Sequence, residues 1–275
     1  MKKTSPRRPA NAAPASRAPW RWALGGALLG LGLVGVLAAP ARWLAAGVAQ
    51  ATGGMVLLTE PQGSLWTGSA RLLLTGGAGS QDRAALPGRV QWRLRPALGA
   101  LRLDLTADCC TPGAPLAARV SPLWGGARVA LADSPAQAPS RWPAALLAGL
   151  GTPFNTIQPQ GELALATQGL AAEWRAGRAS LQGSAELTLR NLSSRLSTLQ
   201  PLGSYRVQLR GGDAVALELS TLEGPLRLSG SGQWVGARLR FSGEATAAPE
   251  QQAQLANLLN LLGRRQGDRA LMNFG

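Results

Sequence analysis

The stretch that decides the fold is VQWRLRPALGALRLDL, residues 90–105. Apolar and polar side chains alternate over residues 90–95 and again over residues 101–105, and Pro96 and Gly99 lie between the two runs. Period-two alternation buries one face of a strand and leaves the other face in water. The stretch therefore predicts two antiparallel strands joined by a short turn.

The same alternation recurs along most of the chain after residue 55. It is found at Leu163 with Leu165, Leu187 with Leu189, residues 205–210, residues 215–219, Leu226 with Leu228, and Leu239 with Phe241. Glycine next to Asp, Pro or Ser separates most of these segments, as turns require. We therefore expect a mainly β fold, a curved and half-barrel-like antiparallel meander with two or three short helices.

Helical spacing is confined to a few segments. Four leucines repeat at helical spacing between Pro249 and Gly263, which predicts a helix packed on the sheet. These leucines are Leu255, Leu258, Leu259 and Leu262. A second short helix is expected over residues 141–150, and residues 192–199 fit either a third short helix or a bent strand.

The N-terminal region combines a basic tail with an uncharged apolar stretch, residues 23–41, between Trp22 and Trp43. The cations of the tail are Lys2, Lys3, Arg7, Arg8, Arg17 and Arg21. A helix that joins the two tryptophans would match the ~30 Å hydrocarbon thickness of a bilayer. Since basic residues stay cytoplasmic, we expect a cytoplasmic tail over residues 1–22, a transmembrane signal-anchor helix over residues 23–42 and an exported domain over residues 43–275.

Two further features of the chain bear on this organisation. Ala39, Pro40 and Ala41 form a small-x-small pattern, so a signal peptide cleaved after Ala41 is the alternative to a retained anchor. Gly26 and Gly30 form a Gly-x-x-x-Gly pair, which favours close approach of two helices in a homodimer.

The exported domain itself divides at a loop rich in Pro, Ala and Ser, residues 132–139. This loop separates possible halves over residues 55–135 and 140–275. Residues 63–74 and 161–174 begin alike, with a Gly-x-Leu unit before a strand, which is the pattern expected of a duplicated strand module.

Composition removes most classes of enzyme. The chain has no histidine, which excludes Ser/His and Cys/His catalysis and zinc sites of the Cys/His type. Lysine occurs only at positions 2 and 3, so no phosphate loop of the Lys-Ser/Thr type is present. The net charge of +14 comes with a general excess of Ala, Gly, Leu, Pro and Arg, so we do not read it as nucleic-acid binding. We expect no catalytic residues, no cofactor and no metal.

The acidic pair and the two cysteines are the remaining residues for which a chemical role has to be considered. Asp104 and Asp108 are the nearest acidic pair, and an exported carboxylate hydrolase is a distant third possibility, because such an enzyme needs two acids facing one cleft. Cys109 and Cys110 are adjacent, and an exported compartment favours oxidation. A vicinal disulfide ranks first, and a disulfide to another chain or two buried thiols are the alternatives.

Three motifs carry the candidate interaction residues. Residues 62–68 bracket Trp66 with two glycines, and residues 202–205 end on Tyr205, the one tyrosine of the chain. The C-terminal run over residues 258–269 ends in a polar turn that holds Arg264, Arg265 and Asp268. Both arginines follow the expected helix, where the helix dipole favours cations.

Read in order, these features resemble the type II secretion system protein N family of Gram-negative bacteria. The matching segments are the basic tail with one apolar stretch and residues 63–68, 201–205, 221–226 and 262–268. The resemblance implies a non-enzymatic accessory of the inner membrane with a single span. The bulk of the chain would be periplasmic and would contact other single-span subunits of the secretion platform, or exported cargo.

A second, more distant resemblance is to the AsmA-like envelope proteins, in which a curved sheet presents an apolar groove to lipid chains. It implies an envelope protein that binds or transfers lipid. The two interpretations share a fold and differ in what fills the concave face of the sheet.

Overall fold

The structure is a computed structural model that describes residues 20–111, 113–134, 139–236 and 238–275. Most of the predicted basic tail and part of the predicted loop over residues 132–139 lie outside these residues. The chain divides into two compact units, Met1–Ala39 and Pro40–Gly275.

The predicted continuous helix over residues 23–42 is wrong in its bounds. Helix α1 covers Trp20–Leu37, and a separate helix α2 covers Ala41–Ala51, so Trp43 belongs to the second helix. Pro40 lies between them, and proline interrupts a helix because it has no amide hydrogen and its ring clashes with the preceding turn. Within the described residues, no helix combines the length and the apolar character that crossing a membrane requires.

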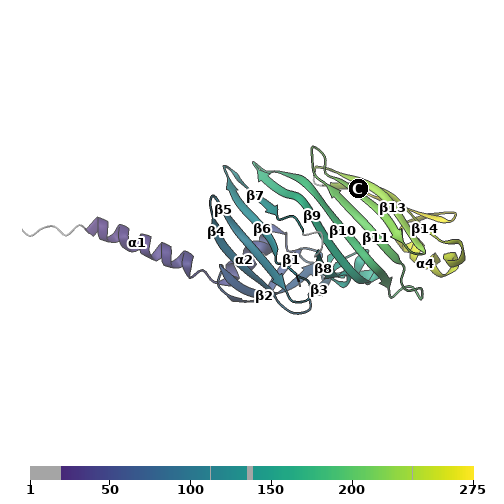
Figure 1. Cartoon of the computed structure of the whole chain (residues 1–275), viewed down its shortest axis with the longest axis horizontal. Helices are drawn as coiled ribbons and strands as arrows, with labels where there is room; N and C mark the ends of the chain where they lie inside the picture. Colours follow the sequence, from purple (N-terminus) through teal and green to yellow (C-terminus); the bar gives the residue numbers. More distant parts are fainter. Residues whose placement is uncertain (1–19, 112, 135–138, 237) are drawn as a thin grey trace, which may run out of the picture. The chain divides into compact units, whose positions relative to one another are not determined.

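A single large sheet makes up most of the second unit (Figure 1). Its first strands are β1 (Val56–Gly63), β2 (Thr67–Thr75), β3 (Arg83–Ala85), β4 (Val90–Ala97), β5 (Ala100–Ala107), β6 (Leu116–Leu123), β7 (Gly126–Leu131) and β8 (Ser140–Pro143). The others are β9 (Pro159–Arg175), β10 (Arg178–Ser194), β11 (Gly203–Arg210), β12 (Ala216–Glu223), β13 (Leu226–Val235), β14 (Arg238–Ala247), β15 (Arg264–Gln266) and β16 (Arg269–Phe274).

The strands follow one another as an antiparallel meander. The spatial order is β1-β2-β4-β5-β6-β7-β9-β10-β11-β12-β13-β14-β16-β15, with β3 paired to β2 and β8 paired to β9 beside this path. As described, the sheet is not closed, and β1 and β15 are the edge strands at the two ends of this path. The predicted mainly β, antiparallel fold is confirmed.

Cross-strand register aligns apolar side chains on one face of the sheet. Leu187 of β10 lies opposite both Leu165 of β9 and Val207 of β11, and Val207 lies opposite Leu219 of β12. We call the face that carries this row the inner face. Because side chains alternate along a strand, the intervening Glu, Gln, Ser and Arg residues lie on the outer face.

Helices cover the inner face only in places. The predicted C-terminal helix is confirmed as α4 (Gln252–Leu262), which follows a short 3-10 turn over Pro249–Gln251. Its Leu255, Leu258 and Leu259 are buried in the C-terminal core, together with Tyr205 and Phe241.

The N-terminal strands have cores of their own. One contains Val90, Cys110 and Leu146, and the other contains Ala41, Ala70 and Trp92. They form where η1 (Ala144–Leu150) and α2 pack near the first strands. Burial of each large apolar side chain stabilises the fold by about 1.5–3 kcal/mol.

The helix predicted over residues 141–150 is only partly present. Residues 140–143 form strand β8 on β9, the 3-10 helix η1 follows, and a four-residue helix α3 covers Phe154–Ile157. Pro143 fixes an extended backbone at the start of η1, which explains why a regular helix does not begin earlier. Of the two alternatives for residues 192–199, the bent strand agrees better with the structure, because β10 continues through a register shift to Ser194.

Candidate interaction surfaces

Trp66 lies in the turn between β1 and β2, and this turn is hydrogen-bonded to β4. The Leu94 amide donates a hydrogen bond of 2.7 Å to the Trp66 carbonyl oxygen. The Trp92 indole N–H donates to the Leu65 carbonyl oxygen at 3.1 Å. A Cβ on Gly68 would stand 2.5 Å from the Trp92 ring, so the position requires glycine. The motif thus holds Trp92 in the core, while the Trp66 side chain is half-buried.

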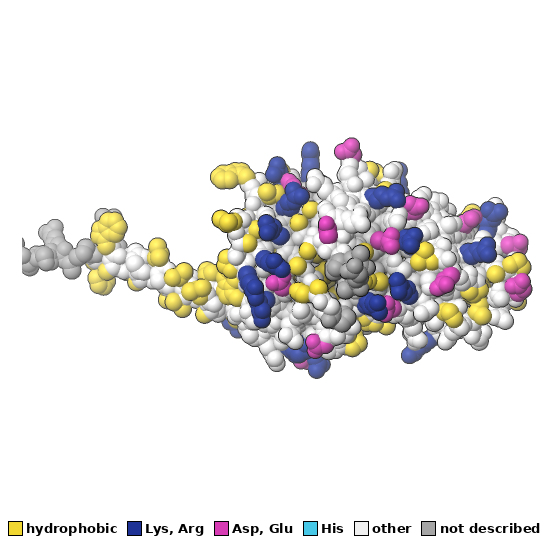
Figure 2. Space-filling view, in the orientation of Figure 1, with side chains coloured by type: hydrophobic (Ala, Val, Ile, Leu, Met, Phe, Trp, Pro, Cys, Tyr) yellow, Lys and Arg dark blue, Asp and Glu magenta, His cyan; other side chains and the backbone are white. Residues whose placement is uncertain are grey.

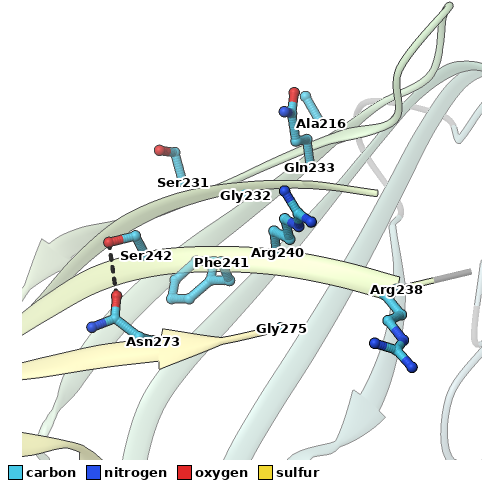
Figure 3. Close-up of a pocket in the computed structure, with 10 residues that line it drawn as sticks. All are labelled: Ala216, Ser231, Gly232, Gln233, Arg238, Arg240, Phe241, Ser242, Asn273 and Gly275. Carbon is cyan, nitrogen blue, oxygen red and sulfur yellow. Dashed lines mark hydrogen bonds between the residues drawn. The ribbon is translucent and has the colours of Figure 1, made fainter. Parts of the chain in front are cut away.

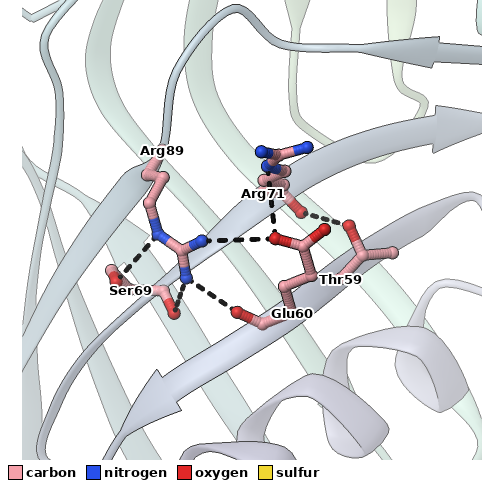
Figure 4. A network of polar contacts seen from close by, with 5 residues as sticks. All are labelled: Thr59, Glu60, Ser69, Arg71 and Arg89. Carbon is pink, nitrogen blue, oxygen red and sulfur yellow. Dashed lines mark hydrogen bonds and ion pairs between the residues drawn. The ribbon is translucent and has the colours of Figure 1, made fainter.

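Beside this turn, the carboxylate of Glu60 meets two arginines (Figure 4). Its Oε2 atom lies 3.3 Å from Arg71 Nε and 3.6 Å from Arg89 Nη1. Arg89 also donates to the Glu60 carbonyl oxygen at 2.7 Å and to the Ser69 hydroxyl at 3.1 Å. Glu60 has a φ of 49°, at the register shift that follows Thr59. The network therefore fixes a bulge in edge strand β1, and such bulges discourage pairing with other chains.

The two motifs around Tyr205 and Leu226 are brought together by the sheet. The Tyr205 hydroxyl donates to the Leu226 carbonyl oxygen at 2.9 Å, and the Leu226 amide donates to the Leu202 carbonyl oxygen at 3.1 Å. A Cβ on Gly203 would stand 2.6 Å from the Glu223 carbonyl oxygen. Tyr205 is 1% exposed, and burial raises the pKa of its phenol. This candidate interaction residue therefore lies in the core and presents no surface to a partner.

The C-terminal candidates lie at the other edge of the sheet. Arg264 and Arg265 form most of strand β15 and are exposed, and Asp268 is exposed in the turn before β16. Arg265 Nε donates to the Gly267 carbonyl oxygen at 3.1 Å, and Arg269 Nη1 lies 3.3 Å from Glu244 Oε2. Among the described ion pairs, none joins Asp268 to either arginine of β15. Two exposed arginines therefore mark a short open edge.

Residues 54–272 match the family described as Type II secretion system (T2SS), protein N. The chain belongs to this family. The matched range includes the Trp66 turn, the joined Tyr205 and Leu226 motifs and the β15 hairpin. No curated protein and no solved structure matches the chain. Membership supports an accessory role in type II secretion.

A surface pocket of this protein N family member has a volume of about 840 Å³ and lies where β13, β14 and β16 adjoin (Figure 3). Arg238, Arg240 and Gln233 line it, and the Ser242 hydroxyl donates to Asn273 Oδ1 at 3.0 Å. Ala216 and Phe241 add apolar surface to the lining, and it contains none of the candidate residues.

The cysteine pair joins β5 to the region of β8. A disulfide links Cys109 to Cys110, and Cys110 is fully buried in an N-terminal core. The Arg141 amide donates to the Cys110 carbonyl oxygen at 2.8 Å. Thr111 closes the turn by donating from its amide to the Ala107 carbonyl oxygen at 2.9 Å. The pair therefore has a local structural role.

The acidic pair considered for hydrolysis is not arranged around a cleft. Asp104 lies opposite Arg93 and forms an ion pair of 2.9 Å with Arg102, whereas Asp108 is exposed in the turn after β5. Across the part of the chain that the structure describes, no three His, Cys, Asp or Glu side chains gather as a metal site.

Sequence reasoning missed the Glu60 network. Arg71, Arg89 and Glu60 are spread over thirty residues, and nothing in their spacing marks them as neighbours. A bulge with a positive φ at a glutamate has no reliable sequence signature.

Proposed function

We propose that the chain is a non-enzymatic accessory of the type II secretion platform that presents its β-rich unit on the periplasmic side of the inner membrane. The family match over residues 54–272 carries this proposal. An open sheet with exposed edge strands suits such a role, because an unpaired edge accepts a strand from a partner.

The proposed contact surfaces are the β15 edge and the Trp66 turn. The β15 edge offers exposed Arg264 and Arg265, which suit an acidic segment of another single-span platform subunit or of exported cargo. The β1 edge is less suited to strand addition, because the Glu60 bulge interrupts it. The Trp66 turn instead offers a half-buried aromatic next to that edge.

Membrane attachment belongs to the α1 region in this proposal. Leu28, Leu29 and Leu31 of α1 are 69–75% exposed, and basic residues precede the helix. Exposed leucines after a basic tail favour association with a membrane. A homodimer through Gly26 and Gly30 would form within the same helix.

Deletion of the gene tests the role in secretion. We expect exoproteins to accumulate in the periplasm, and the full chain to restore their release. Unchanged secretion, with unchanged levels of the other platform subunits, would contradict the proposal. A chain found in the soluble periplasm with Arg42 at its N-terminus would contradict the membrane attachment and support cleavage after Ala41.

A photo-crosslinking residue at Arg265 tests the β15 edge. We expect a product with a platform subunit or cargo, and no such product from the same residue at Arg227, which is exposed in the interior strand β13. A double charge reversal, Arg264→Glu with Arg265→Glu, should lower the crosslinking yield and the secretion rate together. Equal yields from both positions would contradict the edge contact.

A lipid-binding role is the second candidate, favoured by one observation. On the inner face, Leu165, Leu187 and Val207 are half-buried and lie between the N-terminal and C-terminal cores. We would expect acyl chains to occupy this strip if the protein handles lipid. Native mass spectrometry of the purified full chain tests the candidate, and a spectrum free of bound lipid after gentle extraction would count against it.

A further inference from the structure

Hairpin ends along one side of the sheet carry apolar side chains in an unusual position. Leu98 and Trp124, in the turns after β4 and β6, are 102% and 100% exposed. Each precedes a glycine of positive φ, Gly99 at 65° and Gly125 at 75°. Two-residue hairpin turns favour Asn, Asp and Gly, so neither leucine nor tryptophan is required by the turn. Folding alone does not explain these side chains.

The apolar turns share one end of the sheet. Because β5 pairs with β6 and β7 pairs with β9, the turns after β4, β6 and β9 all lie at the same end of the strands. The third of these hairpins adds Trp174, which is 49% exposed. Leu98, Trp124 and Trp174 are called the tip residues here. Figure 2 shows hydrophobic side chains projecting at the upper left of the β-rich unit, over the ends of β4–β7, with basic side chains around them.

Arginines stand directly behind the tip residues. Register sets Arg95 opposite Arg102, and Arg102 opposite Arg119. Like charges directly opposite each other destabilise a sheet, and among the described ion pairs of these three arginines there is one, between Arg102 Nε and Asp104 Oδ1 at 2.9 Å. Arg128, Arg175 and Arg178 extend the basic surface to the next two hairpins, where Glu173 is the neighbouring acid.

Exposed apolar side chains with arginines behind them suit binding to the surface of an anionic bilayer. Tryptophan prefers the membrane interface, and anionic headgroups attract basic side chains that lie close to them. The apolar side chains lie on separate turns, so each one projects by itself and they do not form a continuous patch. A protein partner is instead bound by a contiguous apolar patch with a polar rim.

The chain also enters the β-rich unit at this end. Pro40, the first residue of the unit, bridges Ser64 in the β1–β2 turn. Strand β2 then begins at Thr67, opposite Arg93 of β4, on the side of the sheet where β4 runs toward Leu98. An N-terminal segment attached to a membrane would therefore reach the unit at the end that bears the tip residues.

We infer that the tip residues and the arginines behind them dock on the surface of a bilayer that contains anionic phospholipid. This inference rests on the proposed attachment of the N-terminal region to the membrane. Docking would hold the hairpin ends at the headgroups and leave the opposite end of the sheet in water.

The test uses the full chain on vesicles of phosphatidylethanolamine and phosphatidylglycerol. Single variants Leu98→Cys, Trp124→Cys and, as the control, Leu222→Cys carry an environment-sensitive fluorophore. Leu222 is 43% exposed and lies near the β12–β13 turn, at the opposite end of the sheet. We expect quenching by a shallow nitroxide lipid at positions 98 and 124, and none at position 222.

Charge variants provide a second measurement. Arg95→Gln with Arg102→Gln should lower the ratio of docked to undocked tips about fivefold for each lost cation. The control Arg227→Gln, an exposed arginine of β13 near the opposite end, should leave the ratio unchanged. Replacing phosphatidylglycerol by phosphatidylcholine should lower the ratio further than the double variant does, because it also removes the attraction of the remaining arginines.

Two results would overturn the inference and separate it from the proposed function. If the chain stays on the vesicles while labels at positions 98 and 124 are as accessible to water as at position 222, attachment stands and tip docking is wrong. If the chain does not remain on the vesicles at all, both attachment and docking are wrong.

Discussion

Tyr205 shows how a single buried hydroxyl joins separate parts of the chain. Its contacts with the carbonyl oxygens of Leu202 and Leu226 connect two turns at one end of the sheet. A buried hydroxyl needs such partners, because an unsatisfied one costs about 1–3 kcal/mol. The sequence left Tyr205 with two interpretations, a buried aromatic at a strand end or an interaction residue, since a tyrosine next to Gly-Ser looks the same in a core and at an interface.

The buried phenol predicts loss of stability in alkali. An unfolded tyrosine ionises near pH 10, and burial raises the pKa of Tyr205 above that value. Above about pH 10 the unfolded chain therefore releases this proton more readily than the folded chain, and the free energy of unfolding falls as pH rises. Urea unfolding at a series of pH values should show this fall.

Tyr205→Phe is the matched variant for that measurement. It should lose about 1–3 kcal/mol at neutral pH, because a carbonyl oxygen is left without its donor, and it should lack most of the alkaline fall. The two lysines are the other side chains of this sequence that ordinarily titrate near pH 10. An identical alkaline profile for Tyr205→Phe would show that the phenol is not the responsible group.

Gly68→Ala should destabilise the Trp66 turn. The new Cβ would stand 2.5 Å from the Trp92 ring, so we expect a loss of about 1–3 kcal/mol in the free energy of unfolding. Gly47→Ala in α2 is the control, because no atom lies within 4 Å of its Cβ position. That helical substitution should be neutral or stabilising by up to about 1 kcal/mol. Equal effects of both variants would contradict the steric argument.

At the level of elements, α4 is held on the sheet by burial of its apolar face. Leu255, Leu258 and Leu259 are 0–2% exposed, while Leu261 of the same helix is 41% exposed. The helix is short and lacks a side-chain cap at its N-terminus, so packing rather than helix propensity stabilises it.

Leu255→Ala should therefore cost far more than Leu261→Ala. Removal of the buried side chain leaves a cavity and should lower the free energy of unfolding by about 2–5 kcal/mol. The exposed leucine should change it by less than about 0.5 kcal/mol. Chemical denaturation of both variants measures the difference, and similar losses would mean that α4 is not packed as described.

At the scale of the whole molecule, the β-rich unit has its cores toward the two ends of one sheet. The C-terminal core under α4 and the N-terminal cores share no residue among those described. The long strands β9 and β10, of 17 residues each, connect them. Local openings therefore need not spread from one end to the other.

Hydrogen exchange tests this independence. In a variant with Leu255→Ala and Leu259→Ala, amides of β11–β16 should exchange faster, while amides of β1, β2 and β4 keep their protection. Exchange measured by mass spectrometry resolves these segments. Uniform loss of protection across the sheet would mean that it opens as a single cooperative unit.

The sequence by itself determined the antiparallel β class, the α4 helix and the family. Each of these follows from a local pattern, the alternation over residues 90–105 or the leucine spacing before Gly263, and local patterns are set by which side chains must avoid water. The break between α1 and α2 was not predicted, although proline at position 40 is a local signal that interrupts a helix.

Only the tertiary structure decided which residues meet. Burial of Tyr205, the Glu60 network at the β1 edge and the gathering of Leu98 and Trp124 at one end of the sheet all depend on strand register. Register is fixed by the sum of many cross-strand contacts between distant segments, so no single stretch of sequence encodes it. The candidate surfaces of this chain therefore follow from its pairing of strands, whereas its fold class follows from the strands alone.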